Sequence, residues 1–141
     1  MRMETFIRKS LRLKAHTVTE VEERPDGVLV RIDLIHGRRV RCGGCGRLTS
    51  RVVHRRAERR WRDLSLRDRP LTLAYMPCRV RCRSCGVRVE KVPWASRWQR
   101  VTDALLEAVA RLSRMLSWKE TAGHFKLDWK TVAAAVKRAV A

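Results

Sequence analysis

Two cysteine pairs constrain this chain more than any other feature of its sequence. The pairs are CGGC at residues 42–45 and CRSC at residues 82–85, and a glycine follows each of them directly. A CxxC turn presents two thiolates from one loop, so two turns supply the four ligands of a tetrahedral zinc site with Zn–S distances of about 2.3 Å. The glycine lets the backbone turn so that amides point at the sulfurs. We therefore expect one Zn²⁺ per chain, held by Cys42, Cys45, Cys82 and Cys85.

Other uses of the thiols fit the sequence less well. The N-terminal residues MRMETFIRKSLRLK have scattered charges and no apolar run of a secretory signal, so we expect a cytoplasmic location, where thiols stay reduced. Five cysteines would leave one unpaired in a disulfide framework, and no βαβ pattern supports a redox role. Cys78 is an alternative ligand, but it shares a strand face with Val80, which favours a buried apolar role. Because four cysteines complete the site, we expect His36 and His54 to be solvated or to contact phosphate.

Positive charge is concentrated around the cysteine pairs. The formal net charge is +19, of which residues 1–37 carry +1, residues 38–100 carry +15 and residues 101–141 carry +3. This distribution predicts a polyanionic partner, either nucleic acid or an anionic membrane surface, and of the two we expect nucleic acid and no membrane. No stretch approaches the run of about 18 apolar residues that a membrane span needs. The stretch HRRAERRWR (54–62) also contains Trp61, which could stack on a base, anchor the loop or pack on the metal module. Its predicted phosphate contacts are Arg55, Arg56, Arg59 and Arg60.

The first hundred residues have the patterns of short strands. A short helix is predicted over 4–13, and HTVTEVEER, PDG and VLVRIDLIH predict a hairpin with its turn at residues 25–27. LTLAYMPCRVRC (71–82) predicts a strand bent at Pro77, with arginines and cysteines on opposite faces. Thirty-six residues separate Cys45 from Cys82. That separation exceeds the usual spacing of about 15–20 residues and leaves room for an inserted hairpin.

After Val101 the period changes to that of helices, and three short ones are predicted. Thr102, the S-x-x-E box at 117–120 and Asp128 are their expected N-caps. The last two helices have the layout of a helix-turn-helix, although Lys126 stands where glycine is usual, so we expect either a left-handed or an altered turn there. The predicted apolar positions of the third helix are Trp129, Val132, Ala133, Val136 and Val140. Its opposite face offers the expected DNA contacts Lys130, Thr131, Lys137 and Arg138.

Taken together, the motifs resemble a known family. In order, they are CGGCG, HRRAERRWRDLSL, CRVRCRSCG, EKVPWAS and SWKETAGHFKLDWKTVAAAVKR. From about residue 28 onward the chain resembles the N-terminal part of ISL3-family insertion-sequence transposases. The resemblance implies a zinc-binding module and a helix-turn-helix that together bind the inverted repeats at the element ends in double-stranded DNA. It also implies a bacterial, nucleoid-associated protein and leaves open a homodimer on paired ends.

The predicted fold class is α+β, with an N-terminal β-hairpin and a zinc-ribbon-like β module followed by a three-helix helix-turn-helix. The predicted segments are 1–37, 38–98 and 99–141. Family members also have an acidic, metal-dependent catalytic domain, for which these segments leave no room, so we expect the chain as given not to cut DNA. One alternative is a free-standing transcription regulator derived from a transposase. The other is an RNA-associated zinc-ribbon protein, which the helix-turn-helix disfavours because the A-form major groove is too narrow for a helix.

Overall fold

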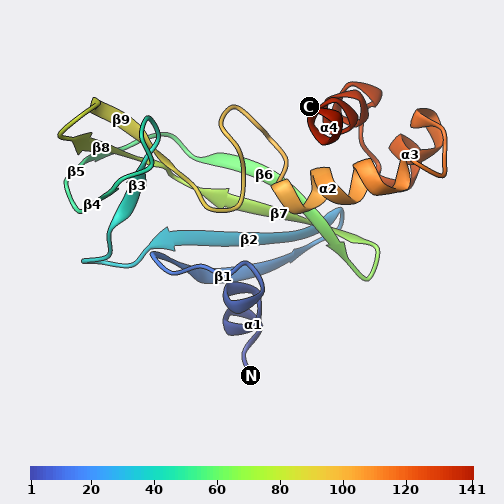
Figure 1. Ribbon diagram of the computed structural model, residues 1–141. Helices are drawn as coiled ribbons and strands as arrows, with labels where there is room; N and C mark the ends of the chain where they lie inside the picture. The colour runs from blue at the N-terminus through green and yellow to red at the C-terminus, as the bar shows by residue number, and fades with distance from the viewer.

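A computed structural model describes residues 1–141 (Figure 1). One helix and nine strands form the first part of the chain and three helices form the last part, which is the α+β class predicted. The strands are β1 His16–Arg24, β2 Gly27–Leu34, β3 Val40–Cys42, β4 Leu48–Thr49, β5 Val52–Arg55, β6 Arg59–Leu66, β7 Arg69–Tyr75, β8 Cys78–Cys82 and β9 Gly86–Lys91. The helices are α1 Met3–Ser10, α2 Asp103–Leu112, α3 Trp118–Phe125 and α4 Trp129–Val140.

The first sheet has the strand order β1-β2-β7-β6. β1 and β2 form the predicted hairpin, β6 and β7 form a second one, and β2 and β7 pair in parallel. The second hairpin lies in the sequence between the two cysteine pairs, so the long separation is an inserted hairpin as expected. Its pairing with β2 brings parts of segments 1–37 and 38–98 into one sheet. The three-segment division therefore stays a prediction about which parts fold independently.

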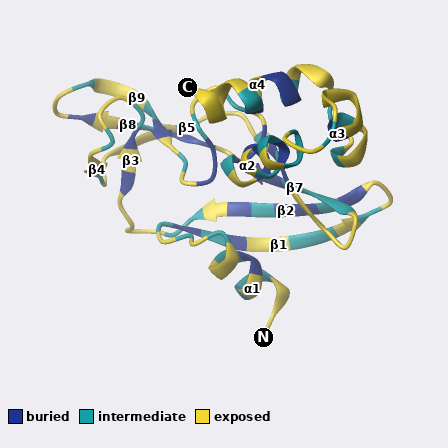
Figure 2. Cartoon of the chain, turned by 45° about the vertical axis from the view of Figure 1, so that its right-hand side comes forward, coloured by how far each residue is buried: buried dark blue, intermediate teal, exposed yellow.

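The core of this sheet contains Trp61, which is only 1% exposed. Its ring meets that of Trp94 edge to face, with 5.3 Å between the ring centroids. Along β6, alternation directs Trp61 and Asp63 inward, and both are buried. Figure 2 shows buried and half-buried stretches along β2, which lies in the same sheet. Trp61 thus anchors its strand in the first sheet, and the expectation that it stacks on a base is wrong because the ring is not accessible.

The second sheet has the order β4-β3-β9-β8-β5 and carries both cysteine pairs. Its small core consists of Val40, Cys42, Cys78, Val80 and Cys82. Alternation along β8 is as predicted, because the residues facing this core are buried and Arg81 is exposed. The predicted strand over 71–82 is divided, however. Residues 76 and 77 separate β7 from β8, and the two strands belong to different sheets.

A buried carboxylate joins the two sheets. The side chain of Glu90, on β9, is fully buried, and its Oε2 lies 3.0 Å from Nε2 of His16 on β1. Its Oε1 accepts hydrogen bonds from the Tyr75 hydroxyl, from Cys78 N at 3.1 Å and from Cys78 Sγ at 3.2 Å. Burial opposes ionisation of Glu90, but bonds from His16, Tyr75 and the Cys78 amide bring its pKa below the ordinary value. One ionised group therefore holds β1, β7, β8 and β9 together.

Helices α2, α3 and α4 form one packed unit with a core of Val101, Leu105, Leu106, Val109, Val132 and Ala135. All three predicted N-caps are present: Thr102 accepts from Leu105 N, Ser117 and Glu120 form a capping box, and Asp128 accepts from Thr131 N. The expectation that Trp129 and Val140 lie in the core is wrong, since they are 61% and 81% exposed. Both stand at ends of α4, beyond the part of the helix that is packed.

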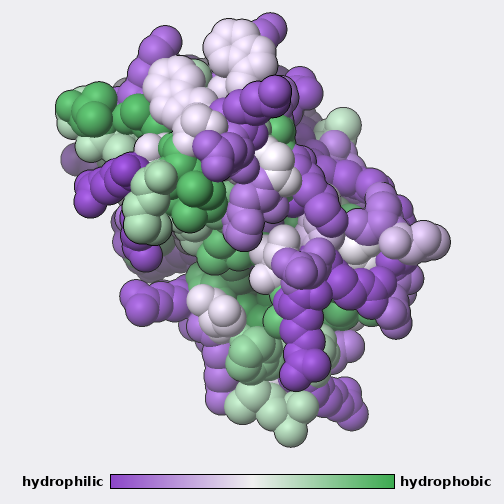
Figure 3. Space-filling model, turned by 90° about the vertical axis from the view of Figure 1, so that its right-hand side faces the viewer, coloured by the Kyte–Doolittle hydropathy of each residue, from purple (hydrophilic) through white to green (hydrophobic).

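The helical unit is docked on β6. Thr102 Oγ1 donates to buried Asp63 at 2.7 Å, and the backbone of Arg62 bonds to Arg100 O and Thr102 N, each at 2.9 Å. The Arg62 guanidinium donates to Phe125 O at 2.7 Å. On the face that includes these helices, hydrophilic side chains stand around smaller hydrophobic areas (Figure 3). The end of α3 is thus held by the sheet that the inserted hairpin completes.

No helix in the structure combines the length and the apolar character needed to cross a membrane.

Candidate metal centre and nucleic-acid interface

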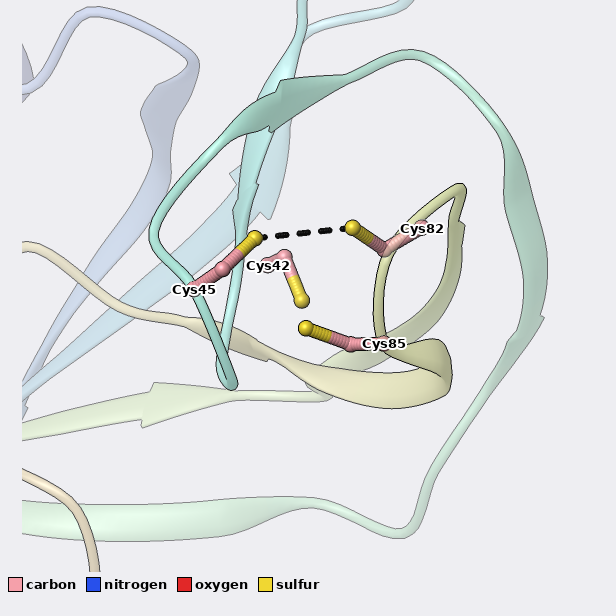
Figure 4. A group of neighbouring side chains, drawn as sticks. All are labelled: Cys42, Cys45, Cys82 and Cys85. Atoms are coloured by element: carbon pink, nitrogen blue, oxygen red, sulfur yellow. Dashed lines mark hydrogen bonds between the residues drawn. The ribbon is translucent and has the colours of Figure 1, made fainter.

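The four cysteines of the two pairs converge at one point (Figure 4). The sulfurs of Cys42, Cys45, Cys82 and Cys85 all lie within 4.8 Å of one another, and those of Cys45 and Cys82 are 3.5 Å apart. Four sulfurs about 2.3 Å from a central zinc are about 3.8 Å apart along the edges of a tetrahedron. The cluster therefore has the size and the ligand set of a structural Zn²⁺ site.

The electrostatics of the cluster also call for a cation. Amides of Cys85 and Ser84 point at the Cys82 sulfur and lower the pKa of that thiol to about 6. The neighbouring sulfurs act in the opposite direction on Cys85, whose pKa is raised to about 12, first by its hydrogen bond with Cys45. Four thiolates at these distances repel one another unless a positive ion lies between them. The residues thus fit one zinc ion per chain.

Glycines shape the CGGC turn in a way that the sequence reasoning did not identify. A Cβ added to Gly43 would lie 2.2 Å from the Val89 carbonyl oxygen, and one on Gly44 would lie 2.9 Å from the Cys85 sulfur. The first contact is with backbone, which cannot move aside without displacing β9. The CGGC turn therefore packs directly against β9 and against Cys85 of the second cysteine pair.

The alternative ligands lie outside the cluster. Cys78 is fully buried and hydrogen-bonded to Glu90, and burial raises the pKa of its thiol to about 12. His36 and His54 are exposed and are not among the grouped ligand atoms. The favoured reading of Cys78, as a buried residue of the strand core, agrees with this position.

The four predicted arginine contacts are divided between two environments. Arg55 donates to Asp33 at 2.9 Å, and Arg60 donates to Glu58 at 3.2 Å, so both already have carboxylate partners. Arg56 is exposed without an ion pair. Arg59 lies over the Trp61 ring and donates to the Gln99 carbonyl at 3.2 Å. Burial and the charges of neighbouring arginines lower the pKa of Arg59, which marks a site short of negative charge.

The predicted contacts on α4 lie on its outer face. Lys130 and Lys137 are exposed, whereas Arg138 donates to Asp103 at 3.0 Å. Thr131, at the N-terminal end, donates its hydroxyl to the Asp128 carboxylate at 2.7 Å. This bond and the Thr131 amide lower the pKa of Asp128, so that the cap is an anion at neutral pH.

The turn before α4 adopts the left-handed of the two conformations expected for it. Lys126 has φ 56° and ψ 47°, the left-handed region, and Leu127 N donates to Ala122 O at 2.9 Å. That bond is the 6→1 bond of a Schellman motif, and Lys126 N donates the accompanying bond to Gly123 O at 3.4 Å, so the last carbonyls of α3 are satisfied. The helix-turn-helix geometry is therefore complete despite the lysine at a position where glycine is usual.

Comparisons with known proteins agree with a metal site at the four cysteines and with a helix-turn-helix after it. Residues 38–85 match the zinc-finger of transposase IS204/IS1001/IS1096/IS1165, and residues 90–140 match the helix-turn-helix domain of transposase family ISL3. The chain is 37% identical over 92 residues to the transposase for insertion sequence element IS1001 of Bordetella parapertussis, a match that covers 64% of this chain. It is 34% identical over 98 residues to the transposase for IS1557 of Mycobacterium tuberculosis, covering 70%. No solved structure matches the chain.

Each match covers 22% of the relative's length, so the chain corresponds to about a fifth of these curated proteins. The two matched domains together extend from residue 38 to residue 140, in the order in which the structure presents the cysteine cluster and the helical unit. With a zinc-finger and a helix-turn-helix of the same family in one chain, this protein belongs to the ISL3 family of transposases and represents an N-terminal region of it.

Proposed function

We propose that this chain recognises the terminal inverted repeats of an insertion sequence in double-stranded DNA and does so without cutting them. The observation that supports it best is the N-terminal end of α4, where Lys130 is exposed beside Thr131 in a fully capped helix-turn-helix. In this motif the second helix enters the major groove with its N-terminal residues on the base edges. Lys130 and Thr131 are therefore the proposed base contacts.

The remaining basic residues are proposed phosphate contacts. Lys137 has no ion-pair partner and lies at the far end of α4. Arg138 must exchange the Asp103 carboxylate for a phosphate, as must Arg55 and Arg60 for their own partners. Such exposed pairs are weak, so the exchange costs little. Arg56 and Arg59 need no exchange and are expected to contribute most.

The metal has a structural part in this proposal. Cys42, Cys45, Cys82 and Cys85 are the proposed ligands, and bound Zn²⁺ supplies a crosslink between the two ends of the inserted hairpin. The sheet containing that hairpin holds Arg62, whose guanidinium bonds the end of α3. The metal module thereby fixes the orientation of the helical unit relative to the arginine-rich strands.

Selection from a random duplex library tests the proposal directly. We expect enrichment of one motif that matches an end of an insertion sequence, and we expect Lys130→Ala to lose preference for it. Enrichment of no motif, with duplex RNA binding as tightly as duplex DNA, would contradict duplex recognition. Metal-dependent nicking that remains through repurification and is lost in a point variant would contradict the absence of cleavage.

A further inference from the structure

A basic groove lies beside the metal cluster and shares only Arg56 and Arg59 with the proposed duplex contacts. Its volume is about 640 Å³, and it lies between the CGGC turn, β9 and the connection from β9 to α2, which is the large loop between the two halves of the molecule in Figure 1. The cationic side chains that line it are Arg56, Arg59, Arg79, Arg88, Lys91 and Arg97. The one lining carboxylate, Glu90, is buried and already bonded.

These cations lack anionic partners. None of the six takes part in an ion pair, although several arginines elsewhere in the chain do. Arg79 Nε is buried and has no hydrogen-bond acceptor. A zinc ion with four thiolates carries a formal charge of −2 and offsets part of this excess at the end of the groove formed by the CGGC turn. The rest of the groove still requires an anion.

An exposed tryptophan completes the lining. Trp98 is 76% exposed and has φ +68°, a left-handed conformation that is a genuine outlier for a bulky residue. The Arg97 guanidinium lies over its ring, 5.0 Å from the centroid. Strained residues persist only where surrounding structure fixes them, and they concentrate at ligand-binding positions.

The loop that carries Trp98 is well anchored. Ser96 donates from its amide and its hydroxyl to Asp103, at 3.1 and 2.8 Å. Gln99 N donates to Ser96 O at 3.2 Å, and Gln99 O accepts from Arg59. The aromatic ring is therefore presented to solvent by a fixed backbone that also contacts the groove.

We propose that this groove binds an unpaired segment of a DNA strand, with a base stacked on Trp98 and the adjoining phosphates on the arginines. Single-strand sites combine a positively charged groove with an aromatic platform, because every base offers a π-face and every nucleotide a phosphate. In an intact duplex the bases stack on one another, so the tryptophan can accept one only where pairing is lost. The inference rests on the proposed function, since the segment would adjoin the duplex that the helical unit holds.

Fluorescence anisotropy with a labelled 15-nucleotide oligo-dT and the zinc-loaded full chain tests the inference. Trp98→Ala should weaken oligo-dT binding about tenfold, as loss of one base–aromatic stack does. Trp98→Phe should restore most of that loss. The matched control is Phe6→Ala, which removes an aromatic ring that is 53% exposed on α1 outside the groove, and it should bind oligo-dT like the parent protein.

Each further result decides between the two proposals. Trp98→Ala should bind a selected duplex within twofold of the parent. Equal oligo-dT affinity in Trp98→Ala and the parent would overturn the groove assignment, even if Lys130→Ala still loses duplex discrimination. Tenfold tighter binding of oligo-U than of oligo-dT would overturn the choice of DNA. If Trp98→Ala weakens oligo-dT binding but the chain prefers no duplex sequence, the groove assignment is supported and the inverted-repeat proposal is refuted.

Discussion

Replacing Glu90 with glutamine should lower the free energy of unfolding, because this carboxylate joins four strands from the two sheets. A carboxylate accepts bonds at both oxygens, whereas the glutamine amide has one oxygen and a donating NH₂ group. If the oxygen stays with Tyr75 and Cys78, the NH₂ group faces His16 Nε2. His16 must then carry its proton on Nδ1, which is buried and has no partner. The variant therefore replaces a fully hydrogen-bonded carboxylate by a neutral amide and leaves a buried N–H group of His16 without an acceptor.

The size of the effect follows from the bonds that change. Bonds to a charged group contribute about 1.5–3 kcal/mol and neutral ones about 0.5–1.5, so each of the three strongest bonds to Glu90 loses about 1 kcal/mol. We expect the free energy of unfolding to fall by about 3 kcal/mol. With a slope of about 1.5 kcal/mol per molar urea, the unfolding midpoint falls by about 2 M.

The effect should depend on pH in a defined direction. The pKa of Glu90 in the folded protein lies below its ordinary value of 4.5, so its charge stabilises the fold above that pH. This stabilisation is lost as pH falls through the folded pKa. The difference between the parent and Glu90→Gln should be complete at pH 7 and should shrink below pH 4.5. Acid also protonates the thiolates, but in both proteins alike.

Urea titration of the zinc-loaded proteins, followed by tryptophan fluorescence, measures this difference, since Trp61 and Trp94 lie close to the junction. Glu107→Gln is the control, because Glu107 is exposed and its closest cation, Arg111, is 3.8 Å away. It should change the free energy of unfolding by less than about 0.5 kcal/mol. If Glu90→Gln unfolds at the same urea concentration as this control, the junction does not depend on the charge.

Four other substitutions test local features. Native mass spectrometry should find one zinc in Cys78→Ser and none in Cys82→Ser, and the reverse pattern would refute the ligand assignment. Gly43→Ala should weaken zinc retention in a chelator competition, because its Cβ meets the Val89 carbonyl oxygen at 2.2 Å; unchanged retention would show that β9 can yield. Lys126→Gly should raise the melting temperature of the helical unit, by relief of about 1 kcal/mol of left-handed strain; a lower temperature would mean that the lysine side chain stabilises the turn.

Local chemistry made the metal cluster and the helical unit predictable. Four thiols at CxxC spacing have few other uses in a reduced environment, and cap residues act within one turn of their own helix. The pattern around Lys126 predicted either a left-handed or an altered turn, and the structure decides for the left-handed one. Trp129 was misplaced because periodicity cannot show where packing stops: side chains lean toward the helix N-terminus, so the first residue of α4 extends beyond its partners.

Contacts between distant segments were not predictable in the same way. The parallel pairing of β2 with β7 joins residues about forty positions apart, and no local pattern selects that partner. Glu90 has the sequence context of an exposed strand residue, and only the fold surrounds it with His16 and Tyr75. Trp98 stands between Arg97 and Gln99 in the sequence, a weak signal that gains meaning only from the groove beside it.

The central claim is that α4 reads the DNA sequence while the arginines of the sheet region supply affinity. Binding isotherms across a salt series, on a selected duplex and a scrambled one, test it most directly. Lys130→Ala should lose about 1–3 kcal/mol on the selected duplex and nothing on the scrambled one.

Changing Arg55, Arg56, Arg59 and Arg60 together to alanine should weaken both duplexes alike. It should also make the log–log salt slope shallower by about 2–4, with Arg56 and Arg59 accounting for about 2 of this. If the arginine variant abolishes discrimination while Lys130→Ala weakens both duplexes equally, the metal module reads the sequence and the account is contradicted.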